Sequence, residues 1–260
     1  MPLNGSLSGP TERQRRILDQ VQLQGFATIE ALAQELGVSA QTVRRDIIQL
    51  DAAGLLQRFH GGAGLPEPVV RLGYVRKEAV LTEAKARIGA AAAAGIADGS
   101  AVFLDVGTTV EAVARALARR RGLRVFTSSL KCGALFDPRE TEVFVTGGLL
   151  RGADGSLVGE AATAALAGFR FDVAVIGCSG FEADGCAMDF DLQKVAVKQA
   201  AIAHSRRAVL VADRSKFGHP AIVRIAPAAA FAALVSDDAP PAGLGAALEA
   251  AGVELVVAGG

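Results

Sequence analysis

Residues 39–46, SAQTVRRD, carry side chains of the types that read the edges of base pairs. Apolar residues recur at i, i+4 and i+7 from Val43, so a helix here would bury that face and expose a polar one. The polar residues are Gln41, Thr42, Arg44 and Arg45. Arginine binds guanine with two hydrogen bonds, glutamine binds adenine, and threonine contacts a thymine methyl or a phosphate. The segment therefore predicts a recognition helix that Ser39 caps.

A recognition helix needs a scaffold, and the flanking residues predict one. Helical spacing of apolar residues covers three segments, each followed by a glycine: 12–23, 29–36 and 40–53. LLQRFHGGAG at 55–64 then has the alternation and the glycines of a two-stranded wing. This order is the winged helix-turn-helix pattern, so residues 11–64 are predicted to bind double-stranded DNA. Thr28, Ser39 and Arg58 are expected to hold phosphates.

The alternative for this helix is an ordinary solvated face. Residues 1–60 hold six arginines and six acidic residues, so no net charge distinguishes the segment. The order of helices, turn, cap and wing favours DNA binding over that alternative, because an isolated charged helix does not require such neighbours.

The bulk composition limits the remaining classes of protein. The chain has 260 residues, which allows two domains, and 27 basic residues balance 27 acidic ones. The three cysteines have no C-x-x-C spacing, so neither a disulfide framework nor a thiolate metal site is expected. The first ten residues lack a signal-peptide pattern and are expected to be disordered, and the apolar runs are too short for a membrane span. A cytoplasmic protein without a membrane partner is the prediction.

Strand-like and helical patterns alternate in the second half of the chain. The strand-like runs are 101–105, 123–127, 142–146, 172–176, 208–212, 233–236 and 254–257. Helical patterns separate most of them, and a longer one at about 79–96 precedes them. This alternation predicts a doubly wound, mainly parallel α/β sheet over residues 78–260. Residues 65–77, with two prolines, are the predicted linker between the domains.

Small and polar residues follow five of these strands, at the edge where such sheets bind ligands. The segments are 105–109 (DVGTT), 127–129 (TSS), 146–148 (TGG), 177–180 (GCSG) and 213–218 (DRSKFG). A helix N-terminus at Thr108 and Thr109 favours a phosphate, Lys216 adds a cation, and Asp105 suits hydroxyl groups. Together they predict a small phosphorylated polyol or sugar. Each loop alone is also an ordinary turn between a strand and a helix.

Two further predictions concern cofactors and the segment before the helix at 192–205. No Walker motif appears and no G-x-G-x-x-G follows a strand, so no nucleotide cofactor is expected.

Ser179 lies in the fourth of the ligand loops. Asp189, Asp191 and Lys194 either line the ligand site or serve the start of the following helix. No metal site and no catalytic residue is predicted.

Over roughly residues 12–241 the chain resembles the DeoR family of bacterial transcriptional regulators. The segments that carry the resemblance are VSAQTVRRDIIQLDAAGLLQRFHGGA, DVGTTVEAVARAL, TGGLLRGADGSLVGEA, GCSGFEADGCAMDFD and ADRSKFG. It implies a DNA-binding domain followed by a non-catalytic sensor domain similar in fold to ribose-phosphate isomerases and CoA transferases. A phosphorylated effector would bind the sensor and release the DNA. Two segments, DFD at 189–191 and GTTVEAVA at 107–114, favour glycerol 3-phosphate over a sugar phosphate as that effector.

The family's effector positions carry over onto matching residues of this chain. They are Asp105, Gly107, Thr108, Thr109, Ser128, Ser129, Gly147, Gly148 and Lys216. The chain departs from the family where Ser128 replaces a frequent asparagine, and where Glu83-Ala84-Lys85-Ala86-Arg87-Ile88 alters a common run.

Three alternatives remain at this point. The regulator could respond to a sugar phosphate, or act as an activator. The chain could be a sugar-phosphate isomerase-like enzyme, with Asp105, Asp189 and Lys216 as acid–base groups. It could also be an architectural DNA-binding protein, which would leave the strand-end loops unexplained. Because helix-turn-helix proteins bind paired half-sites, a homodimer or a tetramer is expected.

Overall fold

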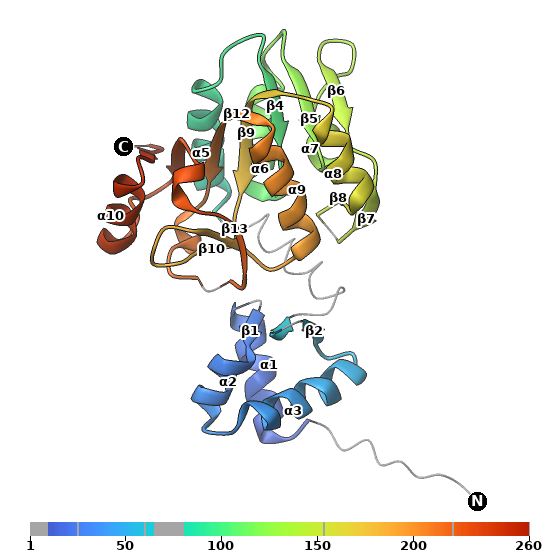
Figure 1. Ribbon diagram of the computed structural model, residues 1–260, viewed down its shortest axis with the longest axis vertical. Helices are drawn as coiled ribbons and strands as arrows, with labels where there is room; N and C mark the ends of the chain where they lie inside the picture. The colour runs from blue at the N-terminus through green and yellow to red at the C-terminus, as the bar shows by residue number, and fades with distance from the viewer. Residues whose placement is uncertain are drawn as a thin grey trace, which may run out of the picture. The chain divides into compact units, whose positions relative to one another are not determined.

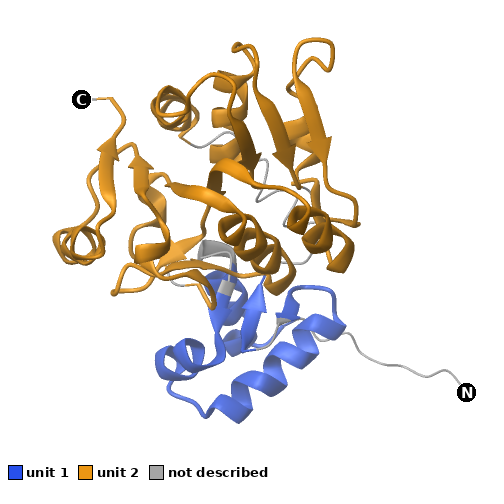
Figure 2. Cartoon of the chain, turned by 45° about the horizontal axis from the view of Figure 1, so that its top comes forward, with its two compact units in different colours: residues 1–73 blue, residues 74–260 orange. Residues whose placement is uncertain are grey.

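The computed structural model describes residues 10–24, 26–59, 61–64, 81–152, 154–219 and 221–259. The chain divides into two units, residues 1–73 and 74–260 (Figure 2). Apart from Pro10, the predicted disordered N-terminus lies outside the described residues, and so does the predicted linker at 65–77. Those boundaries stay predictions.

The N-terminal unit contains the three predicted helices. They are α1 (Glu12–Gln24), α2 (Ile29–Leu36) and α3 (Ala40–Ala52). Thr28 caps α2, because its hydroxyl accepts a hydrogen bond from the Ala31 N–H at 3.1 Å. Gly37 ends that helix in the left-handed conformation, with φ of 65°. The buried side chains Ile17, Val21, Leu32, Val43, Ile47 and Leu50 join the helices in one core.

The wing has one strand more than predicted. β2 (Gln57–Phe59) and β3 (Gly62–Gly64) pair antiparallel, as the alternation indicates. β1 (Phe26–Thr28) pairs with the other side of β3 and makes a three-stranded sheet of order β1-β3-β2. Three residues between two helices are too few to show a strand period.

All seven predicted strands of the second unit form one parallel sheet (Figure 1). They are β4 (Ala101–Leu104), β5 (Arg124–Thr127), β6 (Glu142–Val145), β9 (Phe171–Gly177), β12 (Ser205–Val211), β14 (Ala233–Ser236) and β15 (Glu254–Val257). The strand order is β15-β14-β12-β9-β4-β5-β6. From β4 the chain continues to β5 and β6 toward one edge of the sheet, and from β9 it continues to β12, β14 and β15 toward the other edge. The direction of strand order therefore reverses between the neighbours β4 and β9. That reversal is a topological switch point, where open α/β sheets bind ligands.

Helices cover both faces of this sheet. They are α5 (Thr82–Ala94), α6 (Thr108–Leu117), α7 (Leu130–Gly133), α8 (Glu160–Ala167), α9 (Leu192–Ala203) and α10 (Ala242–Ala250). Side chains alternate between two cores: Phe103 packs with α8, α9 and α10, whereas Val102 and Leu104 pack with α5, α6 and α7. In Figure 1, α8 and α9 lie in front of the sheet. The predicted doubly wound α/β class is confirmed.

α5 and α6 approach each other unusually closely. An added Cβ at Gly89 of α5 would lie 2.5 Å from the backbone oxygen of Ala112 in α6. No side chain fits at this position, so the two helices touch through their backbones.

Short elements that were not predicted complete the unit. β7 (Leu149–Arg151) and β8 (Ser156–Val158) form a hairpin. β10 (Gly180–Phe181), β11 (Ala187–Asp189) and β13 (Val223–Ala226) form a small antiparallel sheet. Within the described residues, no helix is long and apolar enough to cross a bilayer.

Candidate functional site

α3 presents the polar face that its sequence predicts. Gln41, Arg44 and Arg45 are exposed, and Thr42 is half-buried. The Ser39 hydroxyl caps the helix by accepting a hydrogen bond from the Thr42 N–H at 3.2 Å, and the two hydroxyls are 2.9 Å apart. The caps at Thr28 and Ser39 are therefore structural whether or not either residue also holds a phosphate.

One exposed apolar residue on this face was missed from the sequence. Ile48 follows Gln41 by seven residues and Arg44 by four, which places it on the same side of the helix, and it is 50 % exposed. A large apolar side chain among arginines can contact a thymine methyl group. The sequence does indicate this position, because Ile48 is at i+7 from Gln41 and so continues the face formed by Gln41, Arg44 and Arg45.

The opposite side of α3 is anchored by a charged residue. Asp46 is buried, and its carboxylate pairs with the guanidinium of Arg13 from α1 at 2.5 and 3.1 Å. Gln14 donates to Gln49 at 2.8 Å, which adds a second link between the same helices. These contacts fix the rotation of α3 and with it the direction of the exposed arginines.

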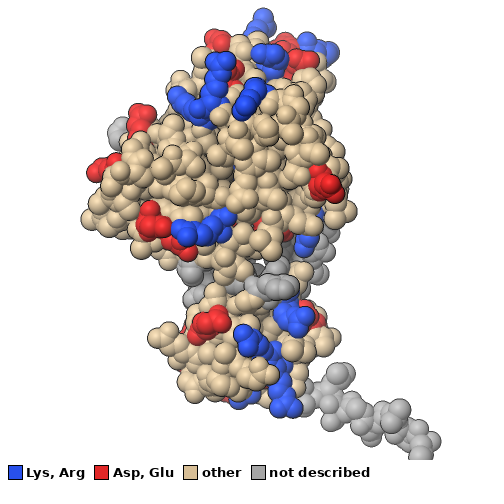
Figure 3. All heavy atoms as spheres, viewed as in Figure 1, with Lys and Arg blue, Asp and Glu red and all other residues tan. Residues whose placement is uncertain are grey.

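Arg58 is exposed on strand β2 of the wing, where its backbone N–H donates to the Asp51 carboxylate at 3.1 Å. In the view of Figure 3, basic side chains form a band on the face of the N-terminal unit. Asp46 is paired with Arg13, so this buried carboxylate offsets one of the six arginines and the unit as a whole stays close to neutral.

In the second unit, a buried ion cluster joins the strand ends at the switch point. Asp105 follows β4 and accepts a hydrogen bond from the Gly177 N–H of β9 at 3.0 Å. Lys198 of α9 contacts the Asp105 carboxylate, lies 3.3 Å from the Asp189 carboxylate, and donates to the Gly177 carbonyl at 2.9 Å. The Ser179 hydroxyl donates to Asp189 at 2.9 Å. Three predicted positions are therefore brought together by a lysine that was not predicted.

The electrostatics of this cluster favour the charged forms of Lys198 and Asp189. Burial by itself lowers the pKa of Lys198, whose side chain is 2 % exposed, but Asp105 and Asp189 raise that pKa above its ordinary value. Burial raises the pKa of Asp189, yet Lys198 and the neighbouring donors lower it below its ordinary value. Burial raises the pKa of Asp105 above its ordinary value, and the opposing effect of Lys198 does not cancel it. Asp189 therefore favours its charged form, whereas Asp105 gains a proton more readily than an ordinary carboxyl group. The carboxyl oxygens of both residues suit ligand hydroxyl groups.

The groups suited to phosphate lie beside the cluster. Gly107 begins α6 with φ of 117° and has no side chain to cap the first turn, so the N–H groups at Thr108 and Thr109 meet the carboxyl edge of the sheet. Lys216 lies in the short 3₁₀ turn (Arg214–Lys216) after β12. Burial raises the pKa of the Cys178 thiol to about 12, while Lys216 and Lys198 act in the opposite direction. Lys216 therefore acts electrostatically on the loop after β9.

The remaining predicted positions lie further along the same edge. Ser128 and Ser129 follow β5 and are buried, and the Ser129 hydroxyl caps α7 by accepting from the Cys132 N–H at 3.1 Å. Gly147 and Gly148 follow β6 and are exposed. Neighbouring strands lie about 4.8 Å apart, so the ends of β12 and β6, four strands apart, are roughly 19 Å from each other. A three-carbon phosphate is shorter than this span.

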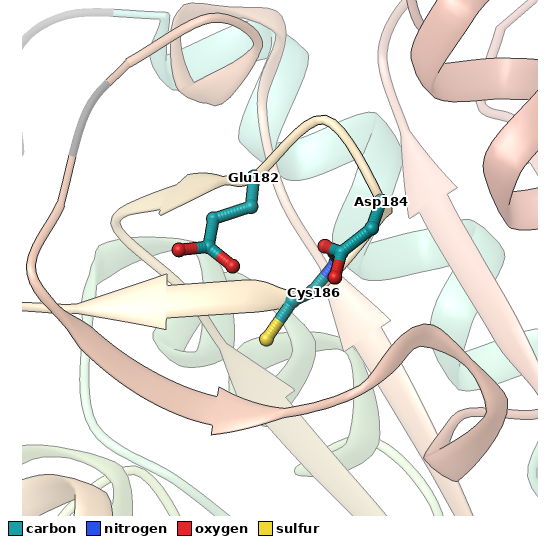
Figure 4. A group of neighbouring side chains, drawn as sticks. All are labelled: Glu182, Asp184 and Cys186. Atoms are coloured by element: carbon teal, nitrogen blue, oxygen red, sulfur yellow. Dashed lines mark hydrogen bonds between the residues drawn. The ribbon is translucent and has the colours of Figure 1, made fainter.

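One group of possible metal ligands occurs within the described ranges, and it already holds a cation. Figure 4 shows Glu182, Asp184 and Cys186 in the turn that joins β10 to β11. The guanidinium of Arg224 lies 3.0 Å from Glu182, 2.8 Å from Asp184 and 3.2 Å from the Cys186 sulfur. A metal ion there would have to displace this arginine.

Comparison with known proteins gives the family. Residues 13–69 match the DeoR-like helix-turn-helix domain, and residues 81–238 match the DeoR C terminal sensor domain. The HTH-type transcriptional repressor CsqR of Escherichia coli (strain K12) is 39% identical over 246 residues, which cover 94% of both chains. The glycerol-3-phosphate regulon repressor of the same organism is 38% identical over 232 residues, covering 89% of this chain and 92% of its own. These relatives are regulators, which favours a regulator over the isomerase-like enzyme.

Among solved structures, ribose 5-phosphate isomerase A of Methanocaldococcus jannaschii aligns with a TM-score of 0.40 and 15% identity, over 52% of this chain and 54% of that one. A score of this size adds nothing to the fold class, which the parallel sheet shows directly. The two matched domains and the curated relatives decide the question: this chain belongs to the DeoR family and is a DNA-binding transcriptional repressor with a C-terminal sensor domain.

Proposed function

We propose that this repressor is released from operator DNA by a small phosphorylated effector, and that the effector is glycerol 3-phosphate. The uncapped N-terminus of α6 at the switch point carries the proposal, because it places anion-binding N–H groups beside the hydroxyl-accepting Asp105 cluster. A phosphate and an adjacent hydroxyl are the two features that such a pair of sites would recognise. Relatives named for the glycerol-3-phosphate regulon support the same effector.

The spacing of strand ends divides the predicted effector contacts into two groups. The inner group surrounds the switch point and comprises Asp105, Gly107, Thr108, Thr109, Ser179, Asp189 and Lys216. The outer group, at the ends of β5 and β6, comprises Ser128, Ser129, Gly147 and Gly148. In this proposal the inner group binds glycerol 3-phosphate. A longer sugar phosphate would use the outer group as well, and it remains the second candidate effector.

Release requires that the effector bind the DNA-incompetent state more tightly than the competent one. A coupling of 1–3 kcal/mol, about 5- to 150-fold in operator affinity, is typical of such linkage. DNA recognition itself is assigned to Gln41, Thr42, Arg44 and Arg45, with phosphate contacts from Arg58 and the helix starts at Thr28 and Ser39.

The repressor is also proposed to act as a homodimer or a tetramer, since paired half-sites need paired recognition helices. The open edge of the sheet suits contact with a second copy of the chain. β6 is the last strand on that side, and four large apolar side chains there are exposed: Phe144, Val145, Leu149 and Leu150. Clustered apolar side chains beside an unpaired strand edge are typical of surfaces that associate.

A thermal-shift series with glycerol 3-phosphate, fructose 1-phosphate, glucose 6-phosphate and inorganic phosphate tests the effector. A ligand at about 100 times its dissociation constant stabilises by roughly 2.7 kcal/mol, which is several degrees for a domain of this size. A shift with glycerol 3-phosphate alone supports the proposal. A shift with another phosphate ester moves the proposal to that ester, and no shift with any of the four refutes the phosphate site.

A further inference from the structure

The hairpin of β7 and β8 lies at the carboxyl end of β5. The Leu157 N–H donates to the Ser128 carbonyl at 2.7 Å, and the Leu130 N–H donates to the Gly155 carbonyl at 3.0 Å. An antiparallel bridge joins the same two segments. The hairpin is therefore bound, backbone to backbone, to the residues that follow β5.

This contact accounts for three of the four outer positions without a ligand. Ser128 and Ser129 are at most 1 % exposed, and the Ser129 hydroxyl already caps α7. An added Cβ at Gly148 would lie 2.6 Å from the Val158 carbonyl oxygen, so a glycine is needed where β7 begins beside β8. A ligand can reach the two serines only if the hairpin is displaced.

The start of α9 holds the other side of the hairpin (Figure 1). The Asp154 carboxylate pairs with the Lys194 ammonium at 2.5 Å, and its second oxygen accepts from the Ser156 hydroxyl at 2.9 Å. The Arg151 guanidinium donates to the Gln193 side-chain oxygen at 2.8 Å. The hairpin thus contacts both the segment after β5 and the first turn of α9.

α9 places this second contact beside the buried cluster. Lys198 follows Lys194 by one helical turn and contacts Asp105 at the end of β4. β4 lies between β5 and β9 in the sheet. The hairpin therefore bounds the inner group on the side of β5. The ends of β12, β9 and β4, which hold the inner group, span roughly 10 Å.

We propose that the β7–β8 hairpin, held by the Asp154–Lys194 pair, limits the length of the effector. It leaves the inner group to a three-carbon phosphate and keeps a hexose phosphate from the outer group. The inference rests on the proposed function, since it assumes a phosphorylated effector at the switch point. Asp154 and Lys194 become specificity-determining residues that act by positioning the hairpin.

The test compares Lys194→Met and Asp154→Ala, which break the pair from either side, with Arg139→Met as the control. Arg139 forms an exposed ion pair with Asp137 in the segment before β6, at the opposite edge of the sheet. Glycerol 3-phosphate and glucose 6-phosphate are titrated separately into each full-length protein, and binding is measured by calorimetry.

The preference between the two ligands, taken as the ratio of their dissociation constants, is the decisive quantity. The unsubstituted protein should bind glycerol 3-phosphate more tightly. Loss of one charge-assisted hydrogen bond changes an equilibrium about 10-fold or more, so either Lys194→Met or Asp154→Ala should reduce the preference about 10-fold. The double substitution should reduce it no further, because both changes remove the same contact. Arg139→Met should keep the full preference.

Hydrogen exchange of the unsubstituted protein provides a second measurement. The Leu157 N–H is hydrogen-bonded to the Ser128 carbonyl while the hairpin is in place. Saturating glycerol 3-phosphate should leave its exchange slow. Bound glucose 6-phosphate should accelerate that exchange, because the hexose occupies its site only with the hairpin displaced.

The outcomes separate this inference from the proposed effector. If the unsubstituted protein binds glucose 6-phosphate as tightly as glycerol 3-phosphate, or more tightly, the length limit is overturned and a phosphorylated effector stands. If Lys194→Met and Asp154→Ala lower the melting temperature but keep the preference, the pair has only a structural role and the inference is overturned. If the unsubstituted protein binds neither ester, the inference falls together with the proposed function.

Discussion

Replacement of Lys198 by methionine tests whether the buried cluster holds the switch point together. Lys198 pairs with Asp105 and Asp189 and bonds the Gly177 carbonyl, so one substitution removes three contacts. Methionine keeps an apolar stem of similar length and creates little cavity. The two carboxylates then remain buried without a cation.

The expected loss in the free energy of unfolding is large, because the Lys198 and Asp105 side chains are both 2 % exposed and solvent screens their interaction little. Removing one partner of a buried ion pair destabilises by about 3–5 kcal/mol. At about 2–4 °C per kcal/mol for a domain of this size, the melting temperature of the sensor domain should fall by roughly 6–20 °C. Lys194→Met on the same helix is the comparison, since the side chains of Lys194 and its partner Asp154 are 19 % and 17 % exposed, so solvent screens this pair more and its loss should lower the melting temperature less.

The pH dependence gives an independent reading of the same cluster. The lowered pKa of Asp189 contributes stability that is present above the unfolded value of about 3.9 and lost as pH falls through the folded value. The raised pKa of Lys198 contributes stability that is present below about 10.4 and lost as pH rises through its folded value. The contributions of Asp189 and Lys198 should therefore be constant between about pH 5 and pH 9. The raised pKa of Asp105 has the opposite sign: it lowers the free energy of unfolding above its folded value, and that loss is relieved as pH falls through this value. In Lys198→Met the unpaired carboxyl groups gain protons more readily, so the deficit should shrink as pH falls from 7 to 5.

Urea unfolding of both variants at pH 5, 6 and 7, followed by circular dichroism, measures these differences. Lys198→Met combined with Asp105→Asn should be less destabilised than the sum of the single changes, because each removes the other's partner. A loss below 1 kcal/mol for Lys198→Met, or a deficit independent of pH, would refute the view that this pair is buried and ionised.

Three further substitutions test other parts of the molecule. Arg45→Ala should cost about 1–3 kcal/mol at one base position if the side chain reads guanine, and fluorescence anisotropy with operator variants distinguishes this from a uniform loss due to a phosphate contact. Gly89→Ala should destabilise the sensor domain by about 1–3 kcal/mol in thermal unfolding, because its Cβ would overlap the Ala112 backbone. Leu149→Lys, at a side chain 62 % exposed beside the open sheet edge, should lower the fraction of dimer in sedimentation; an unchanged distribution would exclude this edge as the contact between copies.

Much of the fold was predictable because its signals are local. The seven strands are continuous apolar runs, and the three N-terminal helices have helical spacing bounded by caps and glycines. The hairpin of β7 and β8, the small sheet of β10, β11 and β13, and strand β1 were not predicted, because segments of two to four residues show no period. Their pairing is decided by contacts distant in the sequence.

The candidate site was predictable at its strand ends and not on its helices. Glycines, serines and threonines after apolar runs point to the carboxyl edge of a parallel sheet. Lys198 lies inside a helical segment, where a lysine ordinarily faces solvent. Its burial follows from how α9 packs on the sheet, which the spacing of residues along the helix does not reveal. Ile48 is the converse case: its position on the exposed face could be read from the helical period.

The backbone contact between Gly89 and Ala112 has a mechanical consequence for signalling in the sensor domain. Helices that touch through side chains can absorb a displacement of a few tenths of an ångström when those side chains change rotamer. At Gly89 no side chain separates α5 from α6, so a change of rotamer cannot absorb a displacement there. The two helices should therefore resist sliding past each other and move together. A small displacement where α6 meets a bound anion would then reach the start of α5 nearly undamped.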